Sequence, residues 1–150
     1  MQTHTIVVGI IYPKAEKFFE EYFHSLLNQT NKEFELILFN NGFISTSHLN
    51  HYLKSFEKQG VKASIINVPN AGPSIVGRQF VIDTLKSPAY DHVRYIIFTD
   101  SDDYYDHKRV EQSVKGLEKH DVVFNDEIPF DSDSKLKGPS LFSYITFTKV

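Results

Sequence analysis

Three acidic residues follow a hydrophobic run in the second half of the chain. Residues 95–99 are aromatic and β-branched, which is typical of a buried strand, and Asp100, Ser101, Asp102 and Asp103 come directly after them. Carboxylates this close repel one another unless a cation lies between them, and a hard divalent ion such as Mg²⁺ or Mn²⁺ prefers oxygen ligands. Because such an ion commonly bridges to phosphate oxygens, the cluster predicts a site for a metal and a nucleotide. The alternative is a solvated acidic loop that caps the next helix.

Composition indicates the class of protein in which such a site would lie. The chain has 150 residues, 41% of them hydrophobic and 23% charged, which is typical of one soluble globular domain. The lack of cysteine excludes disulfides and thiolate metal sites, and a net charge of −3 gives no electrostatic footprint for nucleic acid. The sequence shows no secretory signal pattern and no apolar stretch long enough to cross a membrane. The expected location is the cytoplasm, either free or peripheral to the inner face of a membrane.

Strand and helix patterns alternate along the chain. Strands are predicted at residues 5–11, 34–39, 61–68, 93–99, 121–125 and 141–148. Helices are predicted at 15–28, from a cap at 45–47 to 58, at 75–86, and from a cap at Asp106 to about 119. The stretch 126–137 is predicted to be an acidic loop, and 138–139 a turn. The alternation implies right-handed βαβ crossovers, so we expect a three-layer, Rossmann-like α/β fold with a mainly parallel, mixed sheet.

The polar residues of this pattern gather where the predicted parallel strands end. Ligands bind such sheets beyond the carboxyl ends of the strands. Those ends are residues 11–12, 40–41, 69–70 and 100–103. Since these ends share one edge of the sheet, the sequence predicts a cleft there with the acidic cluster on its wall.

Three segments resemble a known family. Residues 25–30 read Ser-Leu-Leu-Asn-Gln-Thr and are followed by the strand Phe-Glu-Leu-Ile-Leu at 34–38. Residues 70–74 read Asn-Ala-Gly-Pro-Ser, with Arg78 after them, and residues 100–103 give the pattern D-x-D-D. In this order and spacing the segments resemble the inverting, GT-A-fold glycosyltransferases of family 2, over roughly residues 5–125.

The resemblance implies a role for each matching residue. Asp100 and Asp102 would be the D-x-D pair, contacting the ribose and the Mg²⁺ or Mn²⁺ ion that holds a nucleotide-sugar diphosphate, and Asp103 would support them or complete the metal shell. Arg78 would face the nucleotide or orient the acidic loop. Asn40 falls where the family has an aspartate that contacts the nucleobase, and an amide can still pair with a uracil edge.

Further positions complete the implied donor site. The tip of the first strand, Ile11 and Tyr12, would lie beside the base. Asn70 and Gly72 would form a structural turn that also lines the cleft, and Ser101 would lie among the donor contacts. The expected reaction transfers the sugar of a UDP-sugar to a hydroxyl of a saccharide or glycoconjugate acceptor with inversion, in polysaccharide biosynthesis.

The chain also departs from the family pattern. After the first strand it has Tyr12-Pro13-Lys14 in place of Pro-aromatic-Asn, and Gln79 stands where the family has Asn. Family members continue well past the acidic strand, and their second half supplies the acceptor contacts and the catalytic base. The resemblance therefore predicts that this domain is short or truncated at its C-terminus. The acids that follow residue 125 form no recognisable base motif, and the catalytic base stays unidentified; they are Asp126, Glu127, Asp131 and Asp133.

Two other functions compete with this interpretation. One is a nucleotide-binding or interaction module without transfer activity, whose C-terminal strand would offer an open edge to a partner chain or a second copy. The other is a nucleotidyltransferase, which would need a Gly-rich phosphate loop with a basic residue after the first strand, where this chain has Tyr12-Pro13-Lys14. His48 and His51 lack an evident third metal ligand. Tyr104 and Tyr105 are expected to pack, with stacking on a sugar as the alternative.

Overall fold

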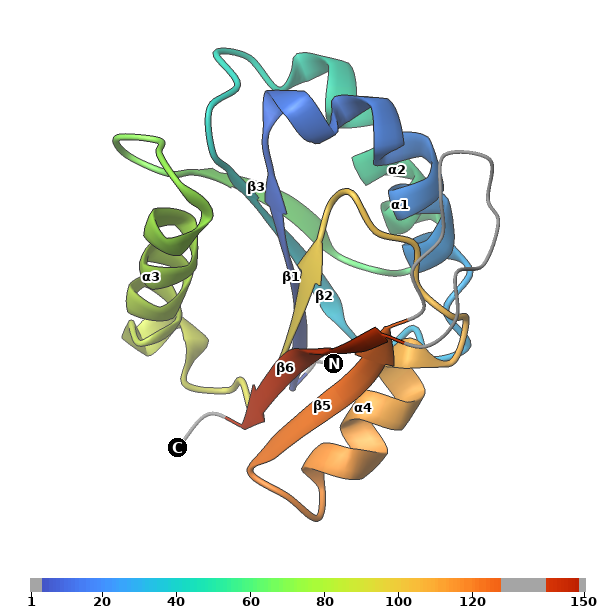
Figure 1. Ribbon diagram of the computed structural model, residues 1–150. Helices are drawn as coiled ribbons and strands as arrows, with labels where there is room; N and C mark the ends of the chain where they lie inside the picture. Colours follow the sequence, from blue (N-terminus) through green and yellow to red (C-terminus); the bar gives the residue numbers. More distant parts are fainter. Residues whose placement is uncertain (1–3, 128–139, 149–150) are drawn as a thin grey trace.

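The computed structural model describes residues 4–127 and 140–148, and a six-stranded sheet lies at its centre (Figure 1). The strand order is β3-β2-β1-β4-β6-β5. The strands are β1 (Thr5–Ile11), β2 (Glu35–Asn40), β3 (Ala63–Asn67), β4 (Tyr95–Asp100), β5 (Val122–Glu127) and β6 (Ser140–Thr148). Strands β1 to β4 are parallel to one another, β6 runs antiparallel to β4, and β5 runs antiparallel to β6. The predicted mixed, mainly parallel sheet is confirmed.

Helices cover both faces of the sheet. The α-helices are α1 (Phe19–Leu27), α2 (Asn50–Lys58), α3 (Ser74–Leu85) and α4 (Arg109–Leu117). Figure 1 shows α3 on one side of the sheet and α1, α2 and α4 on the other. Two separate hydrophobic clusters match this division, since one contains residues of α1, α2 and α4 and the other contains residues of α3. Because β1 lies between the two clusters, all seven of its residues are buried, which explains its nearly continuous apolar sequence.

Short 3₁₀ segments precede two of the helices. The predicted helix 15–28 begins as a 3₁₀ turn, η1 (Pro13–Phe18), before α1, and η2 (Ser47–Leu49) precedes α2 in the same way. Pro13 suits the start of η1 because a first-turn residue needs no amide donor. A further turn, η3 (Pro88–Tyr90), follows α3.

The predicted helix caps differ in detail from the structure. The Thr46 side chain, directly before η2, makes no cap bond, while the Ser45 hydroxyl accepts the N–H of Ser47 at 3.4 Å. The Asp106 carboxylate accepts the backbone N–H of Lys108 at 2.8 Å, but α4 starts only at Arg109, so Asp106 holds the turn before the helix.

The C-terminal strand is the main topological difference from the sequence prediction. β6 pairs with β4 on one side and with β5 on the other, so it is an inner strand, and the prediction that it offers an open edge is wrong. The edges of the sheet are β3 and β5. β5 extends to Glu127, beyond the predicted end at residue 125. The rest of the predicted acidic loop, with Asp131 and Asp133, and the predicted turn at 138–139 lie outside the described residues. Among the described helices, none has the length and apolar character needed to span a membrane.

Candidate functional site

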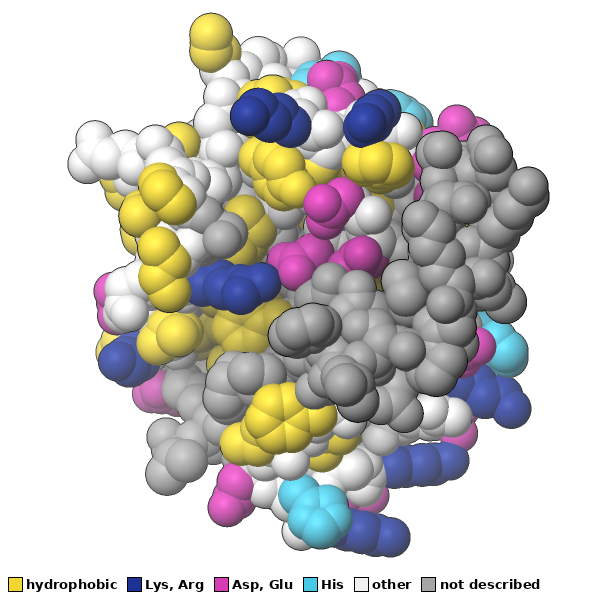
Figure 2. Space-filling view, viewed as in Figure 1, with side chains coloured by type: hydrophobic (Ala, Val, Ile, Leu, Met, Phe, Trp, Pro, Cys, Tyr) yellow, Lys and Arg dark blue, Asp and Glu magenta, His cyan; other side chains and the backbone are white. Residues whose placement is uncertain are grey.

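A cleft of about 340 Å³ opens at the carboxyl ends of the parallel strands. Among the described residues, seven line it, from the tips of β1, β2 and β4 and from α3 and the turn before it: Ile10, Tyr12, Asn41, Gly72, Arg78, Asp100 and Asp102. Figure 2 shows acidic side chains near the centre of this face with a basic side chain beside them. The sequence prediction that the strand ends form one cleft agrees with this geometry.

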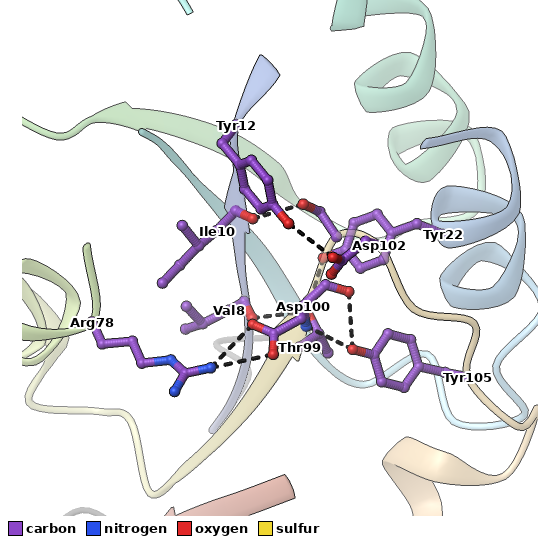
Figure 3. A network of polar contacts seen from close by, with 10 residues as sticks. Val8, Ile10, Tyr12, Tyr22, Arg78, Thr99, Asp100, Asp102 and Tyr105 are labelled. Atoms are coloured by element: carbon purple, nitrogen blue, oxygen red, sulfur yellow. Dashed lines mark hydrogen bonds and ion pairs between the residues drawn. The ribbon is translucent and has the colours of Figure 1, made fainter. Parts of the chain in front are cut away.

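Asp100 is the last residue of β4 and meets a cation in the cleft. The Arg78 guanidinium, from α3, donates through Nη2 to both carboxylate oxygens of Asp100, at 3.2 and 3.3 Å (Figure 3). Both side chains are partly exposed, at 47% for Arg78 and 29% for Asp100, so solvent screens the pair and its net stabilisation is small. The arrangement places one positive group directly beside the first acid of the cluster.

Asp102 is held by a residue at the tip of the neighbouring strand, β1. The Tyr12 hydroxyl, at the tip of β1, donates to Asp102 Oδ2 at 2.8 Å. Burial, and then the bond to Asp102, raises the pKa of Tyr12 to about 12, so its phenol stays a proton donor at neutral pH. Asp102 is otherwise exposed, so its second carboxylate oxygen can accept a ligand from the cleft.

The other two residues of the acidic cluster lie differently. Ser101 has no exposed surface, and its hydroxyl donates to the Ile10 carbonyl at 2.8 Å, so it anchors the loop to β1 and offers no side chain to a ligand. The described residues hold no group of three or more His, Cys, Asp or Glu side chains that could bind a metal ion in this arrangement, and the metal role of Asp103 stays a prediction. Two carboxylates, Asp100 and Asp102, line the cleft. This number fits Mg²⁺ or Mn²⁺ held jointly with phosphate, because such ions commonly use one or two protein carboxylates.

The tip of β2 corrects one sequence expectation and adds a residue. Asn40 is buried, and its amide donates to the Phe43 carbonyl at 2.8 Å and to Asn67 Oδ1 at 2.9 Å, while its oxygen accepts the Phe43 N–H at 2.8 Å. These bonds use both hydrogens of the amide, and Asn40 is 6% exposed and does not line the cleft, so contact with a nucleobase would require its side chain to rearrange. The next residue, Asn41, lines the cleft instead.

Asn41 ties the tip of β2 to the turn before α3. Its side chain donates to the Gly72 carbonyl at 2.8 Å and accepts the Gly72 N–H at 3.0 Å, a reciprocal pair that imitates strand pairing. Asn70, earlier in this turn, has a left-handed φ of 55°, a conformation that Asn tolerates better than most residues. The turn predicted from residues 70–74 therefore forms, and Gly72 lines the cleft as expected while the exposed Asn70 does not line it.

At the tip of β1 the cleft-lining residue is one position from the predicted one. Ile11 is fully buried in the core beneath α1 and α2, whereas Ile10, on the opposite face of the strand, lines the cleft. Side chains of consecutive strand residues point to opposite faces, so Ile11 packs in one hydrophobic cluster while Ile10, 5% exposed and part of the other cluster, borders the cleft. Tyr12 lines the cleft as predicted.

The motif at residues 25–30 contributes through Gln29, which is 2% exposed. Its amide nitrogen donates to the Asp106 carbonyl at 2.7 Å, and its oxygen accepts the Val110 N–H at 2.9 Å. Gln29 therefore joins the end of α1 to the start of α4. This contact fixes the segment that leads away from the acidic loop, which gives the glutamine of the motif a physical role.

Comparisons with solved structures support the fold. The chain of S. aureus TarS 1–349 in complex with UDP superposes with a TM-score of 0.59 at 21% identity, over 80% of this chain and 34% of that one. The mannosyltransferase PcManGT from Pyrobaculum calidifontis, in complex with GDP-Man and Mn²⁺, gives a TM-score of 0.54 at 10% identity, over 80% of this chain and 33% of that one. At such identities the likeness shows the fold alone.

Sequence comparisons identify the family. A glycosyltransferase of Rickettsia bellii (strain RML369-C), itself described as uncharacterized, is 32% identical over 101 residues, which are 67% of this chain and 13% of that protein. The chain thus spans about an eighth of the length of this relative and about a third of the solved structures. The family model of glycosyl transferase family 2 matches residues 7–145. With the fold and the acidic cleft in agreement, this match shows that the chain belongs to glycosyl transferase family 2.

Proposed function

We propose that the cleft binds a nucleotide-sugar, specifically a UDP-sugar, together with Mg²⁺ or Mn²⁺. In this proposal the domain is the donor-binding part of a glycosyltransferase that transfers the sugar to a saccharide or glycoconjugate hydroxyl with inversion, in polysaccharide biosynthesis. The observation that carries the proposal is the convergence of Asp100, Asp102 and Arg78 on one cleft at the carboxyl edge of the sheet. The ligands named for the structural neighbours, UDP, UDP-GlcNAc and GDP-Man with Mn²⁺, support this choice of ligand class.

The charges of the cleft give a reason for a metal requirement. Among the described residues of its lining, two carboxylates and one guanidinium leave one net negative charge, which opposes a diphosphate. Asp100 and Asp102 would hold the ion, which, when bound, supplies a Lewis acid for the negative charge of the departing nucleoside diphosphate. We therefore expect UDP to bind weakly without a divalent ion and tightly with one.

Two side chains of the cleft have roles that do not depend on the ion. Arg78 uses only Nη2 on Asp100, so its other guanidinium donors can contact phosphate oxygens, for which a planar fork is well suited. Tyr12 donates to one oxygen of Asp102 and so orients the other oxygen toward the ligand. Both contacts hold the carboxylates in place before a donor arrives, which lowers the entropy cost of binding.

Calorimetric titration of UDP, with and without Mn²⁺, tests the donor site. Mn²⁺-dependent binding is expected for the wild type, with a loss of at least about tenfold in affinity for Asp102→Ala, about 1.4 kcal/mol. Asp83→Ala is the matched control, because Asp83 is an exposed acid near the far end of α3 that pairs with Gln79 and Lys86. Folded wild-type protein that binds no UDP under either condition, or an Asp102→Ala variant with unchanged affinity, would contradict the proposal.

Transfer is tested separately from binding. Release of UDP from UDP-GlcNAc, measured with and without saccharide acceptors, distinguishes an active transferase from a module that only binds the nucleotide. GDP and ADP titrations under the same conditions test the choice of base. Equal affinity for all three diphosphates would contradict the assignment of a UDP-sugar while leaving the diphosphate site in place.

A further inference from the structure

The end of β4 lies beside the cleft. β4 pairs with β1 as far as Asp100, whereas its described pairs with β6 are those of Tyr95, Ile96 and Ile97. Among the described pairings, Asp100 itself therefore has a strand partner in β1 alone. Backbone groups on the other side need another partner, because a buried N–H without one is costly.

A tyrosine hydroxyl takes the place of the missing strand. Tyr105 Oη accepts the backbone N–H of Asp100 at 2.6 Å and donates to the backbone carbonyl of the same residue at 3.0 Å. Figure 3 shows the Tyr105 ring reaching Asp100 from the side opposite Arg78. One phenol thus bonds to both main-chain groups of the residue whose carboxylate lines the cleft, and the Asp100 carbonyl also accepts the Asp103 N–H at 3.2 Å.

This double role requires a protonated phenol. A hydroxyl can donate and accept at the same time, whereas a phenolate can only accept. Burial, and then the nearby Tyr22 and Asp103, raise the pKa of Tyr105 well above its usual value. The hydroxyl therefore keeps its proton throughout the neutral range.

Tyr105 is itself held firmly. The residue is 4% exposed, its ring contacts the Tyr22 ring edge to face at 6.1 Å between centroids, and the Arg109 guanidinium lies 5.5 Å from its ring centre. The chain just after it is fixed by Gln29, which bonds to the Asp106 carbonyl and the Val110 N–H. These contacts hold the Tyr105 hydroxyl in a fixed position beside the end of β4.

We propose that Tyr105 is a positioning residue that fixes the Asp100 backbone, and through it the Asp100 carboxylate, for binding of the metal and diphosphate. The inference rests on the proposed donor site, to which it adds a residue that touches neither metal nor nucleotide. The sequence predicted packing or sugar stacking for Tyr105, and its low exposure fits packing with this added bonding role.

The test compares Tyr105→Phe with Tyr22→Phe. Both changes remove one buried phenol from the same core, but the Tyr22 hydroxyl bonds to the Thr99 side chain and not to Asp100. Hydrogen exchange of the Asp100 amide is measured by NMR, and UDP affinity by calorimetry with Mn²⁺. In Tyr105→Phe we expect exchange of the Asp100 amide to accelerate about tenfold or more, and UDP affinity to fall about tenfold, since a buried N–H has lost its acceptor.

The control separates positioning from general stability. Tyr22→Phe is expected to lose comparable thermal stability but to keep UDP affinity within about threefold, because its lost bond does not involve Asp100. Equal exchange and equal affinity in the two variants would overturn the proposal.

Two further outcomes are also decisive. If Tyr105→Phe does not fold, hydrogen exchange of the Asp100 amide in the wild type tests the proposal. Exchange at the rate of an unprotected amide would refute the hydrogen bond to Tyr105. If the wild type binds no UDP, the donor site fails as a proposal, while exchange in the two variants still tests whether Tyr105 fixes Asp100.

Discussion

The tips of β2 and β4 lie at the same edge of the sheet, and both end in polar residues, yet they use them in opposite ways. At the tip of β2 the amides of Asn40 and Asn41 bond to the backbone of the chain itself, at Phe43 and Gly72. At the tip of β4 a phenol satisfies the Asp100 backbone, and the Asp100 carboxylate faces the cleft. A polar side chain is available to a ligand only where other groups satisfy the main chain around it.

Exchanging amide and carboxyl groups between the two tips tests this difference and should have the largest effect. Asn40→Asp removes both donor bonds of a buried amide and places a carboxylate near the Phe43 carbonyl, so we expect a loss of about 3 kcal/mol in unfolding free energy at pH 7. Asp102→Asn, the reverse change at an exposed position, should alter stability by less than about 0.5 kcal/mol. Urea unfolding at pH 7 measures both variants.

The pH dependence of Asn40→Asp gives a second reading of the same change. Burial favours the neutral acid, so the folded-state pKa of the new carboxyl should lie above its unfolded value of about 3.9. The folded state then binds more protons above that pH, and the stability deficit should grow as the pH rises from 4 toward 7. A deficit that is the same at pH 4.5 and pH 7 would argue against a buried, internally bonded position for this side chain.

The same contrast explains what sequence could predict. The strands, the helices and the position of Asp100 and Asp102 at the sheet edge followed from hydrophobic periodicity and from the shared edge of parallel strands, whereas Arg78 was predicted from the family resemblance. The choice between Ile10 and Ile11, or between Asn40 and Asn41, depends on which of two consecutive residues faces the cleft. That choice is made by strand register, by the local bond of Asn40 to Phe43, and by bonds to Asn67 and Gly72, which are distant contacts that no local pattern encodes.

Long-range topology hid two other features. β6 is inserted between β4 and β5, although its sequence is equally compatible with an edge strand. The role proposed for Tyr105 depends on how the chain is arranged around the end of β4, which is a property of the assembled sheet. The sequence therefore predicted the acidic residues of the candidate cleft but not the groups that bond to the backbone beneath them.

A smaller effect should come from the packing beneath the β4 tip. A Cβ at Gly9 would overlap the Tyr22 hydroxyl and lie 3.0 Å from Leu38 Cδ2. Because Tyr22 passes over Gly9 to bond with Thr99 on the neighbouring strand, Gly9→Ala should displace it and cost about 2 kcal/mol of unfolding free energy. Gly72→Ala, whose Cβ would meet Val76 at an ordinary 3.6 Å, is the control and should change stability by less than about 0.5 kcal/mol. Thermal unfolding that ranks the two variants equally would refute this account.

Alkaline pH should separate the tips without any effect at neutral pH. The β4 tip depends on protonated phenols, whereas the amides of the β2 tip do not titrate. Burial raises the pKa of Tyr22 and Tyr105 above the usual value of 10.0, and burial with the Asp102 bond raises the pKa of Tyr12 to about 12. Above pH 10 the unfolded chain loses these protons while the folded protein keeps them, so stability is complete below pH 10 and falls as the pH rises toward 12.

Urea unfolding between pH 8 and 11.5 measures this slope. Tyr105→Phe and Tyr22→Phe should each show a shallower decline than the wild type, since each lacks one of the tyrosines that must stay protonated. Asn41→Ala should be less stable at every pH but keep the wild-type slope, because its lost bonds to Gly72 involve no titrating group. Parallel curves for all four proteins would mean that the phenols keep no pKa shift in solution, and the proton-dependent support of the β4 tip would have to be abandoned.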